Sequence, residues 1–174
     1  TIYENGYGPT AGIFANGGGE VYINNAATGK IVTIHTTGGS GDGAGIKTMN
    51  GVGDACSKVV ITGKVDIVAD LTKGTNEGLS AVASSIELGG GTIKAIKGAW
   101  CAIRAYGEFV SDNAAIVNVN VKKDDAGNII GAGNYTDTVI EGDFVTNGGM
   151  GTLGYITVGL NGEGSHWVGN YGDN

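Results

Sequence analysis

One short phrase recurs along the chain and constrains its fold more than any other feature. The phrase is a small residue, an aliphatic residue, a variable residue and a second small residue. It occurs at residues 12–15, 45–48, 81–84 and 102–105. Its aliphatic positions are Ile13, Ile46, Val82 and Ile103, which are separated by 33, 36 and 21 residues. Self-similarity on this scale indicates a fold built from stacked repeats, with the differences in length placed in the turns.

Stretches of alternating apolar and polar residues follow these phrases. Alternation with a period of two predicts a β-strand that buries one face. We expect strands at residues 20–23, 45–49, 59–69, 92–96, 116–122, 139–145, 154–160 and 166–171. In the clearest of them, Val117, Val119 and Val121 should face one way, and Asn118 and Asn120 the other.

Two further segments have their own signals. Gly74 and Gly78 oppose a helix at residues 70–85, so we expect a loop followed by a strand there. Residues 123–134 should form a hairpin-like excursion with its turn at residues 125–128.

The composition is that of a packed β-structure. Of the 174 residues, 35 are Gly and one is Pro, and hydrophobic residues make up 41%. The absence of a Gly-X-Y period excludes collagen, and the hydrophobic share excludes a disordered linker. One coil cannot bury its own apolar row, whereas stacked coils bury it and pair each strand with its neighbours. We therefore predict an all-β, single-stranded right-handed parallel β-helix (a β-solenoid) of about five coils, spanning residues 1–174 as one domain; its handedness follows the rule for parallel crossovers.

The charge of the chain argues against several classes of partner. The formal net charge is −7, and Arg104 is the only arginine. Nucleic acids and anionic membrane surfaces attract clustered Lys and Arg, so we expect neither as a partner. No apolar run approaches the length of a membrane helix, and the start shows no signal-peptide pattern. The chain begins within a strand pattern, so we expect a segment of a longer protein.

Three stretches resemble the passenger regions of bacterial type V autotransporters, in particular the large adhesin-like surface proteins of diderm Firmicutes. They are residues 43–70, the phrase Gly-Gly-Gly-Thr-Ile-Lys-Ala at 89–95, and Gly-Ser-His-Trp-Val-Gly-Asn-Tyr at 164–171. The resemblance covers essentially the whole chain and is one of general sequence style more than of a diagnostic motif. It implies a right-handed β-helix displayed outside the cell by an outer-membrane-anchored parent, with a role in adhesion, aggregation or as a stalk. The C-terminal membrane barrel of that family is not part of this sequence.

The carboxylates offer an alternative, because right-handed β-helices also host enzymes that act on polysaccharides. Glu141 and Asp143 are two residues apart, so on one strand they would share a face and suit a general acid and base. A solvated outer face explains the same spacing and is our expectation. Asp66 and Asp70 are weaker candidates, and Asp124 and Asp125 fit a turn.

The basic and aromatic residues supply the candidate binding positions. Arg104 shares a strand face with Tyr106 and Glu108, which predicts either a ligand patch or an ion pair between coils. The aromatic residues near the ends of the chain are Tyr3, Tyr7, Tyr135, Phe144, Tyr155, Trp167 and Tyr171. They could bind sugar rings or a partner, or they could cap the narrow core. From these sets, Trp167, Tyr155, Tyr171 and Arg104 are the candidate ligand-binding residues.

Metal and cysteine chemistry receive little support. Residues 38–43 resemble one copy of a glycine-aspartate calcium repeat, but such sites need stacked copies. His35 and His166 have no second ligand at zinc spacing.

Cys56 and Cys101 could form a disulfide between neighbouring coils or serve as two small buried hydrophobes. We expect no cofactor, no metal and no catalytic residue.

Together these observations predict an extracellular structural or adhesive scaffold at a bacterial cell surface. It would contact a host-cell or sibling-cell protein or glycan through its faces and through insertions at residues 70–76 and 123–134. Two alternatives stay open. One is a β-helical lyase or hydrolase using Glu141 and Asp143, and the other is a filament subunit that associates end to end through its open strand edges.

Overall fold

The chain is almost entirely β-structure, and its sheets are parallel. The computed structural model describes residues 2–4, 11–37, 42–49, 56–70, 75–107, 113–148 and 153–173. Within these residues the strands form a nine-stranded sheet, a six-stranded sheet and a two-stranded hairpin, and the single helical segment is a 3-10 turn, η1 (Ala26–Thr28). The prediction of an all-β chain with parallel strands is therefore confirmed. In the same residues no helix has the length and apolarity needed to cross a membrane.

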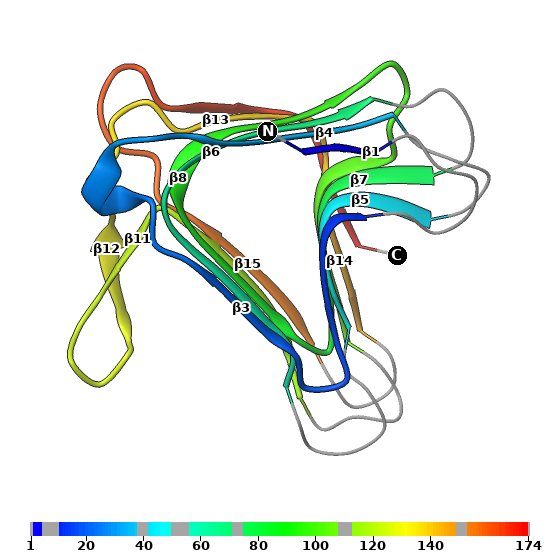
Figure 1. Cartoon of the computed structure of the whole chain (residues 1–174), viewed down its shortest axis with the longest axis horizontal. Helices are drawn as coiled ribbons and strands as arrows, with labels where there is room; N and C mark the ends of the chain where they lie inside the picture. Colours follow the sequence, from blue (N-terminus) through cyan, green and yellow to red (C-terminus); the bar gives the residue numbers. More distant parts are fainter. Residues whose placement is uncertain are drawn as a thin grey trace.

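The strands lie on three faces around a triangular core (Figure 1). The first face is made of β3 (Glu20–Ile23), the first halves of β6 (Lys58–Asp70) and β8 (Ser85–Ile96), β10 (Ala115–Val119) and β15 (Gly154–Val158). The second face is made of β1 (Ile2–Glu4), β4 (Val32–Thr36), the second halves of β6 and β8, β13 (Val139–Glu141) and β16 (His166–Val168). The third face is made of β2 (Ala11–Asn16), β5 (Asp42–Met49), β7 (Thr75–Val82), β9 (Cys101–Gly107), β14 (Phe144–Gly148) and β17 (Tyr171–Asp173).

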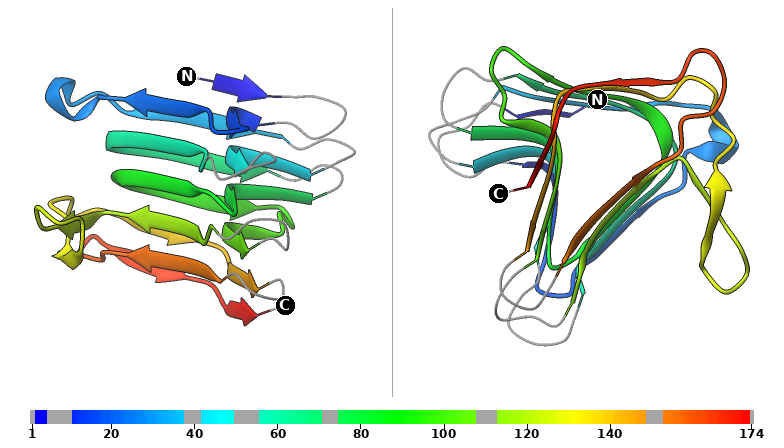
Figure 2. Two further views of the ribbon diagram at one scale, coloured as in Figure 1. Left: turned by 90° about the horizontal axis from the view of Figure 1, so that it is seen from below. Right: turned by 180° about the vertical axis from the view of Figure 1, so that it is seen from behind.

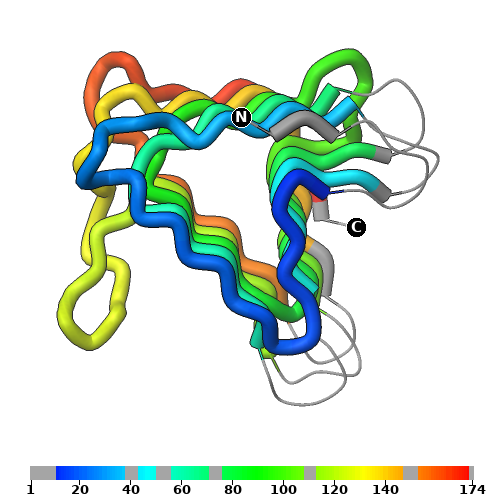
Figure 3. Tube along the Cα trace, in the orientation of Figure 1, coloured from blue at the N-terminus to red at the C-terminus, as the bar shows by residue number. Residues whose placement is uncertain are grey.

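The chain passes over the three faces in the same order each time, and successive passes lie over one another (Figures 2 and 3). Paired residues stay in register from pass to pass: Ile34 pairs with Ile67, and Ile67 pairs with Ile93. The backbone hydrogen bonds between passes therefore run along the stack, and its two termini lie at opposite ends (Figure 2).

Rows of apolar side chains, most of them aliphatic, fill the core. The third face contributes Ile13, Ile46, Leu79, Ile103 and Phe144, and the second contributes Ile34, Ile67, Ile93, Ile140 and Trp167. The first face contributes two rows, Val21, Val59, Ile86, Val117, Ile156 and Ile23, Ile61, Leu88, Val119, Val158. Most of these side chains are fully buried, so each row is a continuous strip of hydrophobic contact along the stack.

The predicted repeat position Val82 is wrong. The residue that stacks on Ile46 and Ile103 is Leu79, whereas Val82 pairs with Met49 and Tyr106. A second copy of the phrase, Gly-Leu-Ser-Ala at residues 78–81, begins three residues before the copy at residues 81–84. Two overlapping phrases were therefore present, and only the first one is in register with the neighbouring passes.

Two predicted strands are each divided by a corner. Residues 139–145 form β13 and the start of β14, with Gly142 at φ +127° between them. Residues 166–171 form β16 and the start of β17 in the same way. By contrast β8 continues across the corner between the first and second faces, where Gly91 adopts φ +112° and a Cβ would overlap the backbone of Val65. Glycine is needed there both for its backbone conformation and for the close approach.

Candidate functional site

A hairpin leaves the stack at one corner and stands beside the first face (Figure 1). It consists of β11 (Val121–Lys123) and β12 (Ile129–Ala132), paired antiparallel, which confirms the predicted hairpin-like excursion. Its tip is fixed by Asp124, whose carboxylate accepts hydrogen bonds from the backbone N–H of Asn128 (2.8 Å) and from its Nδ2 (3.0 Å). These bonds hold the pKa of Asp124 below its usual range.

Asn120 produces the corner from which the hairpin departs. Its φ of +51° ends β10, so the predicted single strand over residues 116–122 is interrupted and Val121 does not join the core row of Val117 and Val119. Its buried Nδ2 donates to the carbonyl oxygens of Tyr135 and Gly159, both at 2.8 Å. The Asn120 side chain therefore joins the base of the hairpin to the next pass of the stack.

Two clefts separate the hairpin from the first face. One, of about 280 Å³, lies over β6 and β8 and is lined by Val60, Ile61, Thr62, Glu87, Leu88, Gly89, Asn118, Val121 and Lys123. The other, of about 410 Å³, is the hairpin groove, and it is lined by Ile116, Asn118, Lys123, Gly127, Asn128, Ile129, Tyr155 and Thr157. Both volumes are of the order found for small-molecule sites.

An ion cluster holds the hairpin against the first face. The Oε1 atom of Glu87 lies 3.1 Å from Nζ of Lys58 and 3.0 Å from Nζ of Lys123. Partial burial raises the pKa of Glu87, but the hydrogen bonds from Lys123 and Lys58 outweigh burial and bring that pKa below its ordinary value. The carboxylate is therefore ionised at neutral pH and binds two strands of the stack and the hairpin together.

The aromatic candidates lie at the C-terminal end of the stack. The rings of Phe144 and Trp167 are stacked in parallel with centroids 4.2 Å apart, and Nε1 of Trp167 donates to the carbonyl of Gly142. The hydroxyl of Tyr171 is 2.6 Å from that of Thr146. Trp167 therefore packs on the core, as the capping interpretation expects. Tyr155 and Tyr171 are exposed at the edge of a cleft of about 400 Å³ that Phe144 and Trp167 also line.

Arg104 forms an ion pair between coils. Its Nη1 donates to Oε1 of Glu77 at 3.2 Å, and its guanidinium lies 4.6 Å from the ring centre of Trp100 and 4.9 Å from that of Tyr106. Glu77 is 3% exposed, and burial raises its pKa, while the charge of Arg104 opposes that rise. The predicted neighbour Glu108 lies outside the described residues. The Arg104 guanidinium thus contacts one carboxylate and two aromatic rings.

The cysteines are not bonded to one another. Cys101 is buried next to Glu77, and its burial raises the pKa of the thiol, whereas Cys56 is exposed. Of the two interpretations offered for the pair, a disulfide is excluded, and only Cys101 is a small buried hydrophobe.

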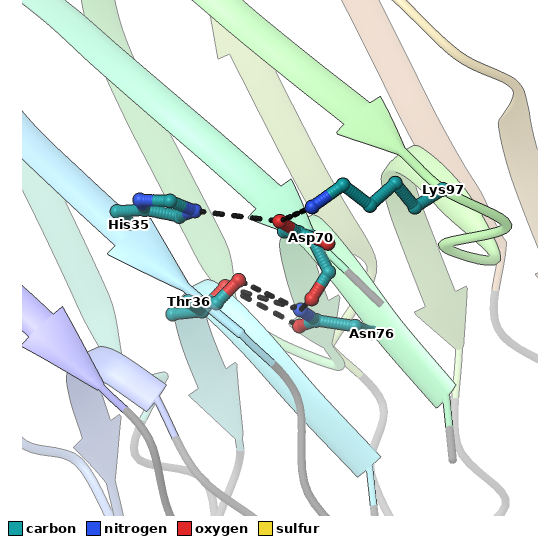
Figure 4. Close-up of polar contacts among 5 residues, drawn as sticks. All are labelled: His35, Thr36, Asp70, Asn76 and Lys97. Carbon is teal, nitrogen blue, oxygen red and sulfur yellow. Dashed lines mark hydrogen bonds and ion pairs between the residues drawn. The ribbon is translucent and has the colours of Figure 1, made fainter. Parts of the chain in front are cut away.

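A polar ladder crosses three passes on the second face (Figure 4). Nζ of Lys97 lies 2.7 Å from Oδ2 of Asp70, and Nε2 of His35 lies 3.9 Å from the same oxygen. Beneath them the buried Asn76 donates from Nδ2 to the carbonyls of Thr36 (3.2 Å) and Asp70 (3.1 Å). The ladder thus satisfies the backbone carbonyls of Thr36 and Asp70, the last residues of β4 and β6.

The proposed acid–base pair is not on one strand. Glu141 ends β13, and its Oε1 accepts from Nζ of Lys94 at 2.8 Å. Asp143 lies past the corner at Gly142, where its Oδ1 accepts from the backbone N–H and from Nδ2 of Asn170. The expectation that Glu141 and Asp143 share one strand face is therefore wrong, because Gly142 turns the chain between them.

The described residues contain no cluster of three or more His, Cys, Asp or Glu side chains suited to a metal ion. Of the glycine-aspartate stretch at residues 38–43, residues 38–41 lie outside the described part. The members of the ion cluster, Glu87, Lys58 and Lys123, were not anticipated from the sequence. Lys58 and Glu87 lie at outward positions of alternating strands, whereas Lys123 lies on the hairpin, and no feature of the sequence pairs the three.

No family model, curated protein or solved structure gives a significant match to this chain.

Proposed function

We propose that the chain is a right-handed parallel β-helix and that it serves as an adhesive scaffold on the outside of a bacterial cell. The observation that carries this proposal is the combination of a continuous aliphatic core under three parallel faces with a hairpin held away from one of them. Such a stack is a rigid support, and the hairpin adds clefts that a smooth face does not have.

Several features support the individual parts. Parallel strands joined by crossovers are right-handed in nearly all known cases, which supports the handedness. The resemblance of residues 89–95 and 164–171 to autotransporter passengers supports an extracellular location. The partner would be a protein or glycan of a host or sibling cell, and an acidic surface with a net charge of −7 disfavours nucleic acid.

A non-catalytic role is supported by the contacts and the positions of the Glu141 and Asp143 carboxylates. Glu141 is paired with Lys94, and Asp143 is bonded to Asn170. The two residues do not line any of the clefts described above. A pair of carboxylates that performs glycoside chemistry converges on a substrate cleft.

The test is to apply the purified chain to an array of glycans and to whole cells while assaying released reducing ends. Binding without release is the expected result. Release of reducing ends that the substitution Glu141→Gln abolishes would overturn the scaffold and establish an enzyme.

A second candidate, end-to-end association, is favoured by the strand edges at the C-terminal end. Among the described strands β15, β16 and β17 each pair with one neighbour only. Free edges of this kind template pairing with a further strand. Sedimentation across a range of concentrations should show growing assemblies if the chain stacks on itself, and a constant monomer mass if it does not.

A further inference from the structure

We propose that the hairpin groove binds a short, uncharged saccharide, with the ring of Tyr155 as its stacking surface. This inference rests on the adhesive function proposed above and assigns that function to one site and one class of ligand.

Tyr155 provides the apolar platform. It projects outward from β15, is 50% exposed, and lies in the groove together with the apolar side chains of Ile116 and Ile129. The CH-rich face of a pyranose ring packs on an aromatic ring, while its hydroxyls need hydrogen-bond partners around the edge. A half-exposed aromatic ring that lines a cleft of about 410 Å³ is therefore suited to one or two sugar rings.

Three polar side chains among the lining residues provide hydrogen-bonding groups. Asn118 and Thr157 come from the first face, and Asn128 comes from the tip of the hairpin. The turn of the hairpin is held by the bonds between Asp124 and Asn128, and the adjoining Lys123 is paired with Glu87 on the first face, so these groups are fixed before any ligand arrives. A groove that is already ordered loses little conformational entropy on binding.

The charge of the groove favours a neutral ligand. Lys123 is the only charged residue among those that line it, and its ammonium group is 3.0 Å from the carboxylate of Glu87. A carboxylated or sulfated sugar would have to compete with Glu87 for this cation, whereas a neutral sugar would not.

The experiment compares two groove variants with one matched control. The full 174-residue chain and its variants Tyr155→Ala and Asn128→Ala are applied to an array of neutral and acidic saccharides, and hits are titrated by saturation-transfer NMR. The control is Tyr22→Ala, because Tyr22 is a more exposed tyrosine (61%) on the same face at the other end of the stack. Circular dichroism melting of each variant checks that it is folded.

Neutral saccharides should bind the unmodified chain and the Tyr22→Ala variant equally. Removal of the stacking ring should weaken binding about tenfold, corresponding to an aromatic contact of ordinary strength. The melting temperature of Tyr155→Ala should stay near that of the unmodified chain, since this side chain is exposed. Asn128→Ala loses the exposed Nδ2 bond to Asp124 but keeps the backbone N–H bond to the same carboxylate, so its melting temperature should change little.

Other outcomes separate this inference from the adhesive function. Neutral-sugar binding that survives Tyr155→Ala, or acidic-sugar binding that depends on salt, would overturn the groove assignment and leave adhesion intact. Binding to cells without binding to any saccharide would do the same. Absence of binding to both cells and saccharides would overturn the two proposals together.

Discussion

Single glycine residues decide how closely two passes of the chain can approach. At Gly89 a Cβ would lie 2.7 Å from the carbonyl carbon of Thr62 and 2.8 Å from the carbonyl oxygen of Gly63, and it would overlap the oxygen of Thr62. All three atoms are backbone, so no side chain can move aside to make room. The backbones of β6 and β8 would have to separate.

The substitution Gly89→Ala should therefore lower the free energy of unfolding by roughly 1–3 kcal/mol, as expected for overpacking of a buried backbone contact. The control is Gly172→Ala, since the nearest atom to a Cβ at Gly172 is 4.0 Å away. Urea unfolding followed by circular dichroism measures both. Equal stabilities for the two variants would show that the passes can separate at this corner without cost.

Asn120 serves a different purpose, because its side chain replaces the hydrogen bonds that the corner removes from the sheet. Asn120→Ala should lose about 2–3 kcal/mol of stability, since the buried carbonyls of Tyr135 and Gly159 would be left without their donor. The loss of a residue type that tolerates positive φ adds to this cost. Asn134→Ala, at an exposed position, should change the midpoint of thermal unfolding much less.

The sequence predicts which residues are apolar and inward-facing better than it predicts which of them stack. The repeat phrase correctly predicts that Ile13, Ile46 and Ile103 belong to one row, but it assigns Val82 to that row where the structure has Leu79. Alternation reports the face of a residue, whereas stacking depends on the length of each turn. A pattern with a period of two carries no information on the length of the turns, so it cannot predict which residues stack.

At the scale of elements, the stability that the ion cluster gives to the contact between the hairpin and the first face should depend on pH through Glu87. The folded-state pKa of Glu87 lies below its ordinary value of 4.5, so between these two values the unfolded chain binds the proton more tightly. Stability from this group is therefore complete above about pH 4.5 and is lost as pH falls through the folded-state pKa.

Glu87→Gln should consequently destabilise the chain near neutral pH by about 1 kcal/mol or less, because the partners are partly screened by water. The difference from the unmodified chain should shrink on acidification and on addition of salt. Chemical unfolding at a series of pH values measures it. A difference that grows as the pH is lowered would contradict the assignment of Glu87 as the carboxylate that binds Lys58 and Lys123.

The elements themselves were predicted unevenly, for a physical reason. The hairpin was expected from its turn residues, and the strand after Gly74 corresponds to β7. The division of residues 139–145 into β13 and β14 was not expected, because Ile140 and Phe144 both face the core on either side of the corner. A corner that keeps its flanking residues buried leaves the hydrophobic pattern unchanged. The candidate acid–base pair failed for the same reason, since Gly142 separates Glu141 from Asp143.

At the scale of the whole molecule, each pass contacts only the passes before and after it. Stability in such a stack is a sum of local terms, so amide hydrogen exchange should be slow in β6 and β8, which pair on both sides. It should be faster in the end strands, which are β1, β2 and β3 at one end and β15, β16 and β17 at the other. Hydrogen exchange followed by mass spectrometry resolves these segments. Uniform protection along the chain would show that the stack unfolds as one unit.

The effect of a core substitution should also depend on whether it lies in the middle or at the end of the stack. Ile67→Ala in the middle of its row should cost about 2–5 kcal/mol and accelerate exchange in the neighbouring passes. Trp167→Ala, at the end of the same row, should accelerate exchange in the last pass while leaving the protection of β6 unchanged.

The hairpin also bears on how such a surface could change over generations. It enters and leaves at one corner, and the passes on either side remain paired through β8, β10 and β15 as though it were absent. Chain can thus be inserted or deleted at a corner without altering the rise of the stack. A lineage under pressure to alter what it presents could exchange one projection for another, while selection on the aliphatic rows keeps the support the same.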